Sequence, residues 1–285
     1  MKSFKSPKGL QRWSLEMRTQ GTPVALVPTM GFLHQGHISL MRRARRAVGK
    51  SGKVVVSIYV NPSQFGKGED FKTYPRNLTR DLQLCGQEKV DAVFIPDNAA
   101  MYPGDYSTFV LEEDVSSSLE AVTRPTHFRG VTTIVCQLFN IAQPEVAIFG
   151  EKDFQQAITI KRMVRDLHLP VRILIAPTCR EQDGLAMSSR NAYLSPNQRQ
   201  QATVLYQMIL RARELVNQGK PSSWNPVRLQ KALEPMLLET PGVKLDYLAF
   251  VDSEHLRPMQ RVTRGCRMLL AAYLGSTRLI DNARL

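Results

Sequence analysis

The chain of 285 residues is long enough for one large domain or two smaller ones, and its 43% apolar residues are typical of an ordinary globular protein. Its formal net charge of +13 favours anionic partners, nucleic acid among them. The basic, polar N-terminus and the lack of any run near eighteen apolar residues argue against a signal peptide and a membrane span, so we expect a soluble, cytoplasmic protein. The cysteines show no C-x-x-C spacing, which indicates structural thiols in a reducing compartment. They are Cys85, Cys136, Cys179 and Cys266.

The first strand-to-helix junction carries the most informative motif. An amphipathic helix is expected before Arg18 and a strand over 24–27, after which the chain reads Pro-Thr-Met-Gly-Phe-Leu-His-Gln-Gly-His at 28–37. Such a junction gathers backbone N–H groups and the positive end of a helix dipole, which favours an anion. His34 and His37 can each donate a hydrogen bond to a phosphate oxygen. Phosphate chemistry is the first hypothesis. Two solvated histidines are the simpler alternative, and no third residue with a zinc-like spacing supports a metal site.

The next helix and strand extend this arrangement. The helix predicted over 38–48 carries a cluster of arginines at 42–46 outside its apolar stripe, and a solvated surface is a simpler interpretation than a nucleic-acid patch. The β-branched run at 54–60 is typical of a parallel strand buried on both faces. Ligands bind at the carboxyl ends of such strands, so Asn61 and Gln64 should lie beside the histidines. Amide side chains suit a hydroxyl or a carboxylate, although Asn-Pro is also a common turn signal.

A second polar junction follows further along the chain. We expect a polar helix over 75–88, a strand over 92–95, an extended piece over 107–111 and an amphipathic helix from 131. A buried strand over 146–149 then ends in Gly-Glu-Lys-Asp at 150–153, where Lys152 can place its charge against a phosphate. Gln156, one turn into the next helix, can point into the same cleft. Taken alone, this segment is more simply explained as a surface turn.

The best domain boundary follows the strand predicted over 171–176. Beyond it, Met187-Ser188-Ser189-Arg190 offers two hydroxyls and a guanidinium that can clamp phosphates, with a helix N-cap as the simpler interpretation. Helices ending at Gly219 and around 229–237, with strands over 245–251 and 268–274, indicate a second α+β domain. We therefore predict an α/β protein, with a doubly wound parallel sheet in residues 1–178 and a smaller α+β domain in residues 179–285.

Six segments together resemble the pantothenate synthetase family, the pantoate–β-alanine ligases. They are P-T-M-G-x-L-H-x-G-H at 28–37, V-N-P-x-Q-F at 60–65, H-F-R-G-V at 127–131, F-G-E-K-D-x-Q-Q at 149–156, R-E-x-D-G-L-A-M-S-S-R-N at 180–191 and T-R-L-I-D-N at 277–282. The resemblance implies a Rossmann-like nucleotidyltransferase domain with a C-terminal lid domain. It also implies condensation of pantoate with β-alanine through a pantoyl-adenylate, with ATP split to AMP and pyrophosphate and Mg²⁺ accompanying the ATP. A cytoplasmic homodimer that binds no nucleic acid is implied as well.

The resemblance also implies roles for individual residues. His37 would be the proton donor, with His34, Lys152 and Arg190 as further catalytic residues and no protein ligand to a metal. The implied ATP contacts are Met30, Gly31, Phe32, Leu33, His34, Gln35, Gly36, His37, Gly150, Glu151, Lys152, Asp153, Cys179, Met187, Ser188, Ser189 and Arg190. Gln64 and Gln156 would hold pantoate, and Gln64 would also lie at the β-alanine site. Cys179 departs from the family, which usually has valine there, beside the adenine.

Two alternatives stay open at this point. One is a different nucleotidyltransferase with the same His-x-Gly-His signature, acting for example on a phosphorylated cofactor precursor. The Asn-Pro-x-Gln and Gln-Gln motifs argue against it. The other is a nucleic-acid-binding protein, which the net charge and the arginine-rich helix favour.

Overall fold

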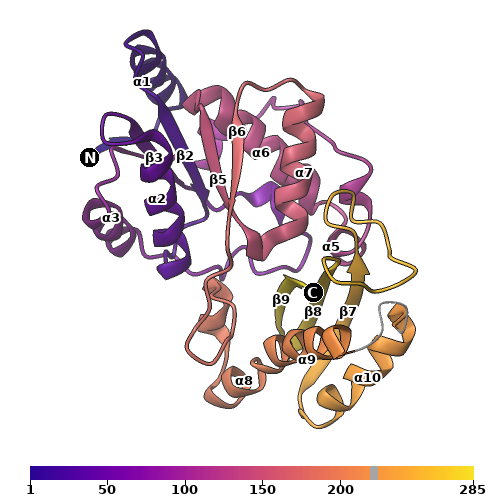
Figure 1. Ribbon diagram of the computed structural model, residues 1–285. Coiled ribbons are helices and arrows are strands. Elements are labelled where there is room, and N and C mark those ends of the chain that lie inside the picture. The colour runs from indigo at the N-terminus through magenta and orange to yellow at the C-terminus, as the bar shows by residue number, and fades with distance from the viewer. Residues whose placement is uncertain (219–223) are drawn as a thin grey trace. The chain divides into compact units, whose positions relative to one another are not determined.

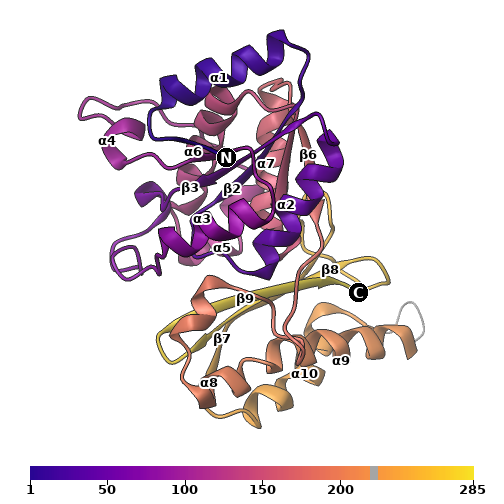
Figure 2. The same ribbon diagram turned by 90° about the vertical axis from the view of Figure 1, so that its left-hand side faces the viewer.

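The structure, a computed structural model, describes residues 1–218 and 224–285. These residues form two compact units, which Figures 1 and 2 show from two sides. Unit 1 comprises residues 1–151 and 155–177, and unit 2 comprises residues 152–154 and 178–285. Residues 152–154 therefore belong to unit 2 by their packing, although they lie between two elements of unit 1 in the sequence. No helix in the described ranges is both long and apolar enough to cross a membrane.

Unit 1 is built on a parallel sheet of six strands in the order β1-β4-β3-β2-β5-β6. The strands are β1 (Lys2–Phe4), β2 (Val24–Thr29), β3 (Lys53–Ile58), β4 (Ala92–Phe94), β5 (Val146–Gly150) and β6 (Arg172–Ala176). Strand β2 lies between β3 and β5, so the strand order reverses there, and the crevice beyond the carboxyl ends of β2 and β5 is where such sheets bind ligands. The predicted doubly wound parallel sheet is confirmed.

Helices cover both faces of this sheet because successive strand residues point to opposite sides and both sides are apolar (Figure 1). Leu26 and Phe149 belong to the core on one face, whereas their chain neighbours Val27 and Ile148 belong to the core on the other. The first face packs against α1 (Pro7–Thr19), α6 (His127–Ala142) and α7 (Phe154–Asp166). The second packs against α2 (Gln35–Val48) and α3 (Leu78–Gln87).

Several short elements of unit 1 were not predicted. They are η1 (Pro62–Gln64), α4 (Asn98–Met101), η2 (Val115–Ser117), α5 (Glu120–Thr123) and η3 (Glu151–Asp153), the last reaching into unit 2, together with the edge strand β1. The piece predicted as extended over 107–111 joins no strand among the described residues. Hydroxyls of α6 replace a strand partner there: Thr133 Oγ1 accepts from the Val110 N–H at 3.0 Å, and Thr132 Oγ1 donates to the Val110 carbonyl at 2.6 Å.

Helix starts differ from the prediction for capping reasons. Helix α2 begins at Gln35 instead of residue 38, because His34 serves as its N-cap. The second histidine of the motif therefore lies in the first helical turn. Helix α3 begins at Leu78 instead of residue 75, because the Asn77 side chain accepts the Arg80 N–H at 3.1 Å.

Unit 2 combines a three-stranded antiparallel sheet with helices, which confirms the predicted α+β character. Its elements are η4 (Ser189–Tyr193), α8 (Pro196–Gln201), α9 (Val204–Gln218), α10 (Pro226–Leu238), β7 (Val243–Val251), β8 (Arg267–Leu274) and β9 (Thr277–Arg284). Met208 of α9 and Leu233 of α10 pack with Leu270 of the central strand in one core. Strand β9 was missed, and the predicted helix end at Gly219 lies outside the described residues.

Candidate active site

The turn after β2 is shaped by a buried carboxylate that the sequence analysis did not single out. Asp81 of α3, 1% exposed, accepts the backbone N–H groups of Phe32 and Leu33, both at 2.8 Å. Gly31 and Phe32 have φ angles of +82° and +50°, in the left-handed region that few residues other than glycine adopt. The Thr29 hydroxyl also accepts the Gly31 N–H, at 3.2 Å. The carboxylate therefore stabilises an unfavourable backbone shape at the carboxyl end of the central strand.

The structure brings the two histidines of the motif together at the start of α2. Their ring centroids are 4.1 Å apart. His34 Nδ1 accepts the Gly36 N–H at 3.1 Å, and His37 Nδ1 accepts the His34 N–H at 3.2 Å. Because each Nδ1 is an acceptor, we assign the proton of each neutral ring to Nε2. Both imidazoles then carry an N–H donor on the nitrogen further from the backbone, beside the positive end of the helix dipole.

The segments after β2 and β5 gather at one edge of the unit 1 sheet. The two strands are parallel neighbours, with Leu26 opposite Ala147. Gly150, half-buried, ends β5, and Glu151 follows it. Loops at the carboxyl ends of adjacent parallel strands share one side of a sheet, so 150–151 lies on the same side as the histidine turn. This is the switch point of the strand order.

Gln64 is held in a defined orientation by a buried amide. Asn61, 1% exposed, donates from Nδ2 to the Gly130 carbonyl at 3.1 Å and to Gln64 Oε1 at 3.0 Å. Its Oδ1 accepts the hydroxyls of Ser63 and Tyr102, both at 2.9 Å. The Gln64 oxygen therefore faces Asn61, and its NH₂ group points away as a donor. A Cβ on Gly130 would lie 2.3 Å from the Ser63 carbonyl oxygen, which explains the glycine of the H-F-R-G-V segment.

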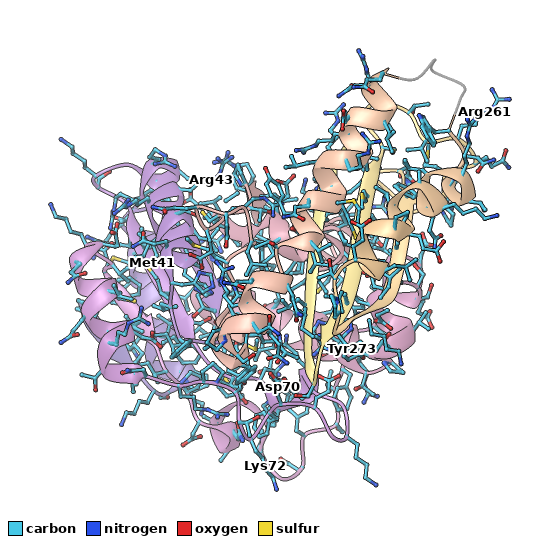
Figure 3. The ribbon with its side chains drawn as sticks, turned by 90° about the horizontal axis from the view of Figure 1, so that it is seen from below. Met41, Arg43, Asp70, Lys72, Arg261 and Tyr273 are labelled. Carbon is cyan, nitrogen blue, oxygen red and sulfur yellow. The ribbon has the colours of Figure 1, made fainter. Side chains whose placement is uncertain are left out.

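The backbone at Gln64 is anchored by two basic side chains. Arg124 Nη2 and His127 Nδ1 both lie within hydrogen-bond distance of the Gln64 carbonyl, at 3.2 and 3.0 Å. Arg124 also binds the Glu69 carboxylate through Nε and Nη2 at 2.9 and 2.7 Å. Burial alone would raise the pKa of Glu69, but the hydrogen bond and charge of Arg124 outweigh it and lower that pKa. The loop that carries Lys72 at its outer edge (Figure 3) is thereby tied to the start of α6.

The two glutamines at the start of α7 have different surroundings. Gln155, 2% exposed, donates to the carbonyls of Val115 and Ser118 at 2.8 and 2.7 Å and accepts the Glu120 N–H at 3.1 Å. It clamps η2 and α5 and is structural. Gln156 is only partly buried, as a residue that contacts a ligand would be.

In unit 2, Lys152 lies close to the predicted phosphate clamp. Together with Ser188, Asn191 and Asp281 it lines a small pocket whose other walls are apolar. The Lys152 side chain is 18% exposed, and its Nζ lies 3.5 Å from Asp153 Oδ1. The Ser188 hydroxyl accepts a backbone N–H at 3.3 Å and so caps η4. The N-cap interpretation is therefore right for Ser188, and it leaves a role in ligand binding open.

The remaining predicted residues of unit 2 surround this cap. The N–H of η4 that Ser188 accepts belongs to Arg190, which is half-buried, while Ser189 is buried. Met187 donates its N–H to the Cys179 carbonyl at 3.0 Å. The backbone of Cys179 is thus fixed, whatever its side chain contacts.

The last motif, 277–282, explains how this cluster is held. Arg180 makes two hydrogen bonds to the buried Asp281, at 2.6 and 2.9 Å, and its guanidinium stacks 4.1 Å from the Tyr206 ring centroid. Gly184, with φ +92°, leaves space for the same ring, because a Cβ there would lie 2.0 Å from Tyr206. Strand β9 thus fixes the turn that precedes the clamp. Neither Asp281 nor Arg180 was given a role from the sequence.

Two arginines of the arginine-rich helix α2 make contacts within unit 1. Arg42 binds Glu88 through two hydrogen bonds at 2.8 and 2.7 Å, and Arg45 binds Asp91 and the Gly52 carbonyl. Acidic partners interrupt the basic face, so this helix does not offer the uniform patch that nucleic-acid binding favours.

The cysteines of the chain are all reduced. All four cysteines, which lie in the described ranges, are thiols and form no disulfide. Burial, reinforced by the charge of Asp81, raises the pKa of the Cys85 thiol to about 12, so that thiol stays protonated. The described residues contain no group of three or more His, Cys, Asp or Glu side chains arranged to hold a metal.

Comparison with known proteins identifies the family. Residues 2–284 match the family model described as Pantoate-beta-alanine ligase. The chain belongs to this family. The pantothenate synthetases of Heliobacterium modesticaldum and Geobacter sulfurreducens are each 47% identical to it over 282 residues, which cover 99% of this chain and 98% of each relative. The resemblance drawn from the six segments is therefore confirmed.

Solved structures of family members have the same fold. A pantothenate synthetase from Thermus thermophilus matches with a TM-score of 0.90 and 42% identity, covering 100% of this chain and 99% of that one. A pantoate-beta-alanine ligase from Francisella tularensis, complexed with beta-gamma ATP and beta-alanine, matches with a TM-score of 0.80 and 33% identity, covering 100% and 97%. This family of ligases therefore shares both units of the chain.

Proposed function

We propose that this protein condenses pantoate with β-alanine to form pantothenate, splitting ATP to AMP and pyrophosphate through a pantoyl-adenylate. The full-length family match carries this conclusion. The Francisella tularensis relative, which binds beta-gamma ATP and beta-alanine, supports the choice of substrates. The paired imidazoles at the start of α2 supply the phosphate donors that adenylation needs.

The residues perform this chemistry without a side-chain nucleophile. A pantoate carboxylate oxygen attacks the α-phosphate, the bond to pyrophosphate breaks, and negative charge grows on the phosphate oxygens. The Nε2–H groups of His34 and His37 and the N-terminus of α2 are fixed donors for that charge, and each such donor is typically worth about a hundredfold to a thousandfold in rate. In the second step the amine of β-alanine attacks the acyl carbon and AMP leaves.

The second unit supplies further donors in this proposal. Lys152 and Arg190 bring positive charge to the phosphates, and Ser188 and Ser189 bring hydroxyls. Other contacts with ATP come from the segments around them. These are Met30, Gly31, Phe32, Leu33, Gln35, Gly36, Gly150, Glu151, Asp153, Cys179 and Met187. Magnesium enters as part of MgATP and would be held mainly through phosphate oxygens and water.

Pantoate is held by amides in this proposal. The NH₂ group of Gln64, turned away from Asn61, donates to an oxygen of pantoate and borders the β-alanine site. Gln156 supplies a second amide from α7. The contrast with the buried Gln155 supports this assignment, because only the second glutamine is exposed to a ligand.

The lid, the compartment and the assembly also belong to this proposal. Residues 1–178 bind nucleotide and pantoate on a Rossmann-type sheet, and residues 179–285 act as a lid that shields the adenylate from water. Proteolysis near 178–184 should then slow with ATP plus pantoate, and equal cleavage rates would count against a lid. The thiol state of all four cysteines fits the reducing cytoplasm. Light scattering on the purified protein tests the proposed homodimer.

A substrate panel in a pyrophosphate-release assay tests the function itself. Pyrophosphate release should require pantoate, and AMP and pantothenate should appear in equal amounts once β-alanine is added. Release with a phosphorylated cofactor precursor instead would favour another nucleotidyltransferase. An RNA mobility assay over a salt series covers the second alternative, which tight binding near physiological salt would support.

A further inference from the structure

Residues 152–154 are gripped by two side chains of the C-terminal sheet. Asn282 of β9 donates from Nδ2 to the Lys152 carbonyl at 2.8 Å. The Arg267 guanidinium of β8 lies 3.6 Å from the centroid of the Phe154 ring. Both contacts fall on the short segment that carries Lys152, which explains why this segment packs with unit 2.

The orientation of the Asn282 amide is fixed by Arg267 and by the Lys152 carbonyl. Arg267 Nη1 donates to Asn282 Oδ1 at 2.6 Å, and an arginine can only donate. The oxygen must therefore face Arg267, and the NH₂ group must face the Lys152 carbonyl. Asn282 is 3% exposed and Arg267 is 5% exposed, so water does not compete for these bonds.

A further contact fixes the backbone of Asn282. Its N–H donates to Asp281 Oδ1 at 2.7 Å, and Asp281 is bound in turn by Arg180, next to the turn that leads to Ser188. One end of β9 thus reaches both Lys152 and the clamp over 187–190. The pocket that Lys152, Ser188 and Asp281 line lies between them.

We propose that Asn282 is a positioning residue for the reaction: it sets the backbone at Lys152 so that the ammonium group meets the phosphates of ATP. This inference rests on the proposed role of Lys152 as a phosphate contact. Asn282 itself touches no reacting atom in this account. A displacement of about 1 Å in a catalytic group can cost on the order of a hundredfold in rate, so losing the hydrogen bond should be visible in kcat.

The substitution Asn282→Asp isolates this hydrogen bond. Aspartate keeps the acceptor for Arg267 and the volume of the side chain, but it places an oxygen opposite the Lys152 carbonyl. We expect kcat for pantoate-dependent ATP–pyrophosphate exchange to fall on the order of tenfold to a hundredfold, with the KM for pantoate within about twofold of wild type. Asn282→Ala should also lower kcat. Because alanine removes the NH₂ donor without adding a charge, this variant separates the lost donor from the added charge.

Two comparisons distinguish positioning from a general loss of structure. The control Asp246→Asn removes the carboxylate that pairs with Arg278 in the same sheet at 3.0 and 2.7 Å, and it should leave ATP–pyrophosphate exchange unchanged. In a Lys152→Ala background, Asn282→Asp should lower kcat for ATP–pyrophosphate exchange by less than about a further twofold. The reason is that the effects of two residues that act as one unit are not additive. Amide hydrogen exchange should rise in a peptide covering 150–156 in Asn282→Asp and stay unchanged in Asp246→Asn.

The outcomes separate this inference from the proposed function. If Lys152→Ala loses exchange activity while both Asn282 variants keep it, the positioning role is wrong and the role of Lys152 stands. Additive losses in the double variant would also overturn positioning. If Lys152→Ala itself keeps full exchange activity, the phosphate contact fails, and the inference fails with it.

Discussion

The two proposed groups of phosphate donors are built in different ways. The histidine turn of unit 1 is shaped by its own helix cap and by one neighbouring carboxylate, Asp81. The cluster around Lys152 in unit 2 is shaped by side chains of β8 and β9, more than a hundred residues further along the chain. The first group therefore combines a local helix cap with one long-range contact from Asp81, whereas the second depends on long-range contacts from two strands.

This difference shows where each group is vulnerable. The first depends on its own helix cap and on the Asp81 carboxylate, so its geometry should be sensitive to changes at Asp81 and insensitive to most changes elsewhere in the molecule. The second depends on a chain of side-chain hydrogen bonds from Arg180 through Asp281 and Asn282 to the Lys152 carbonyl. Substitutions that are distant in sequence from the donors themselves should disturb the second group more than the first.

The largest effect is expected at His37. In His37→Asn, the amide oxygen can still accept the His34 N–H, but the Nε2–H donor is lost. Pantoate-dependent ATP–pyrophosphate exchange should fall about a hundredfold to a thousandfold without a change in the unfolding temperature. His37→Gln provides the matched control, since its amide nitrogen can reach the position of Nε2 while the cap is lost. A smaller loss in His37→Asn than in His37→Gln would show that the cap matters more than the donor.

A large stability effect is expected at Asp81. Asp81→Asn replaces one of two carboxylate acceptors with an NH₂ group facing a backbone N–H, in a side chain that is 1% exposed. The free energy of unfolding should fall by about 2–3 kcal/mol, measured by urea denaturation. Asp183→Asn, which removes an exposed partner of Arg199, should cost less than about 1 kcal/mol. Equal losses in the two variants would mean that Asp81 does not hold the turn.

A moderate and selective effect is expected at the two amides. Gln64→Ala and Gln156→Ala each remove a proposed hydrogen bond to pantoate, worth about 1 kcal/mol, so the KM for pantoate should rise about fivefold to tenfold and that for ATP much less. Initial rates over a grid of both substrates measure the two constants. An ATP-selective defect would reverse the assignment.

The smallest effect is a pH dependence at the Glu69–Arg124 pair. The pKa of Glu69 is lower in the folded state than its unfolded value of 4.5. The pair therefore stabilises the protein above pH 4.5, and that contribution disappears as the pH falls through the folded pKa of Glu69. Glu69→Gln should therefore be about 1 kcal/mol less stable than wild type at pH 7. The difference should shrink below pH 4.5 in thermal melts. A difference that grows on acidification would contradict the sign.

The sequence was most informative where periodicity and chain order agree. The β-branched runs, the strand-to-helix junctions and the His-x-Gly-His spacing were enough to predict the parallel sheet and to place His34 and His37 at the carboxyl ends of its strands. Asp81 was missed because an acidic residue on a polar helix gives no sign of burial. A buried acceptor becomes evident only when the positive φ angles of the turn are known.

The supports of unit 2 were missed for another reason. The segment Thr-Arg-Leu-Ile-Asp-Asn at 277–282 combines strand-forming and polar residues, so no apolar period marks β9. Its polar residues face partners such as Arg180 and Lys152 that only tertiary structure brings near. Lys152 and Ser188 could be chosen for their chemistry, but the side chains that hold them could not.

Direct detection of the acyl-adenylate tests the central claim most closely. The purified protein is incubated with MgATP and pantoate but without β-alanine, quenched, and analysed by mass spectrometry. We predict pantoyl-adenylate in an amount close to that of the enzyme, which disappears when β-alanine is added as pantothenate and AMP form. ADP in place of pyrophosphate, or product formed without any adenylate under single-turnover conditions, would contradict the account.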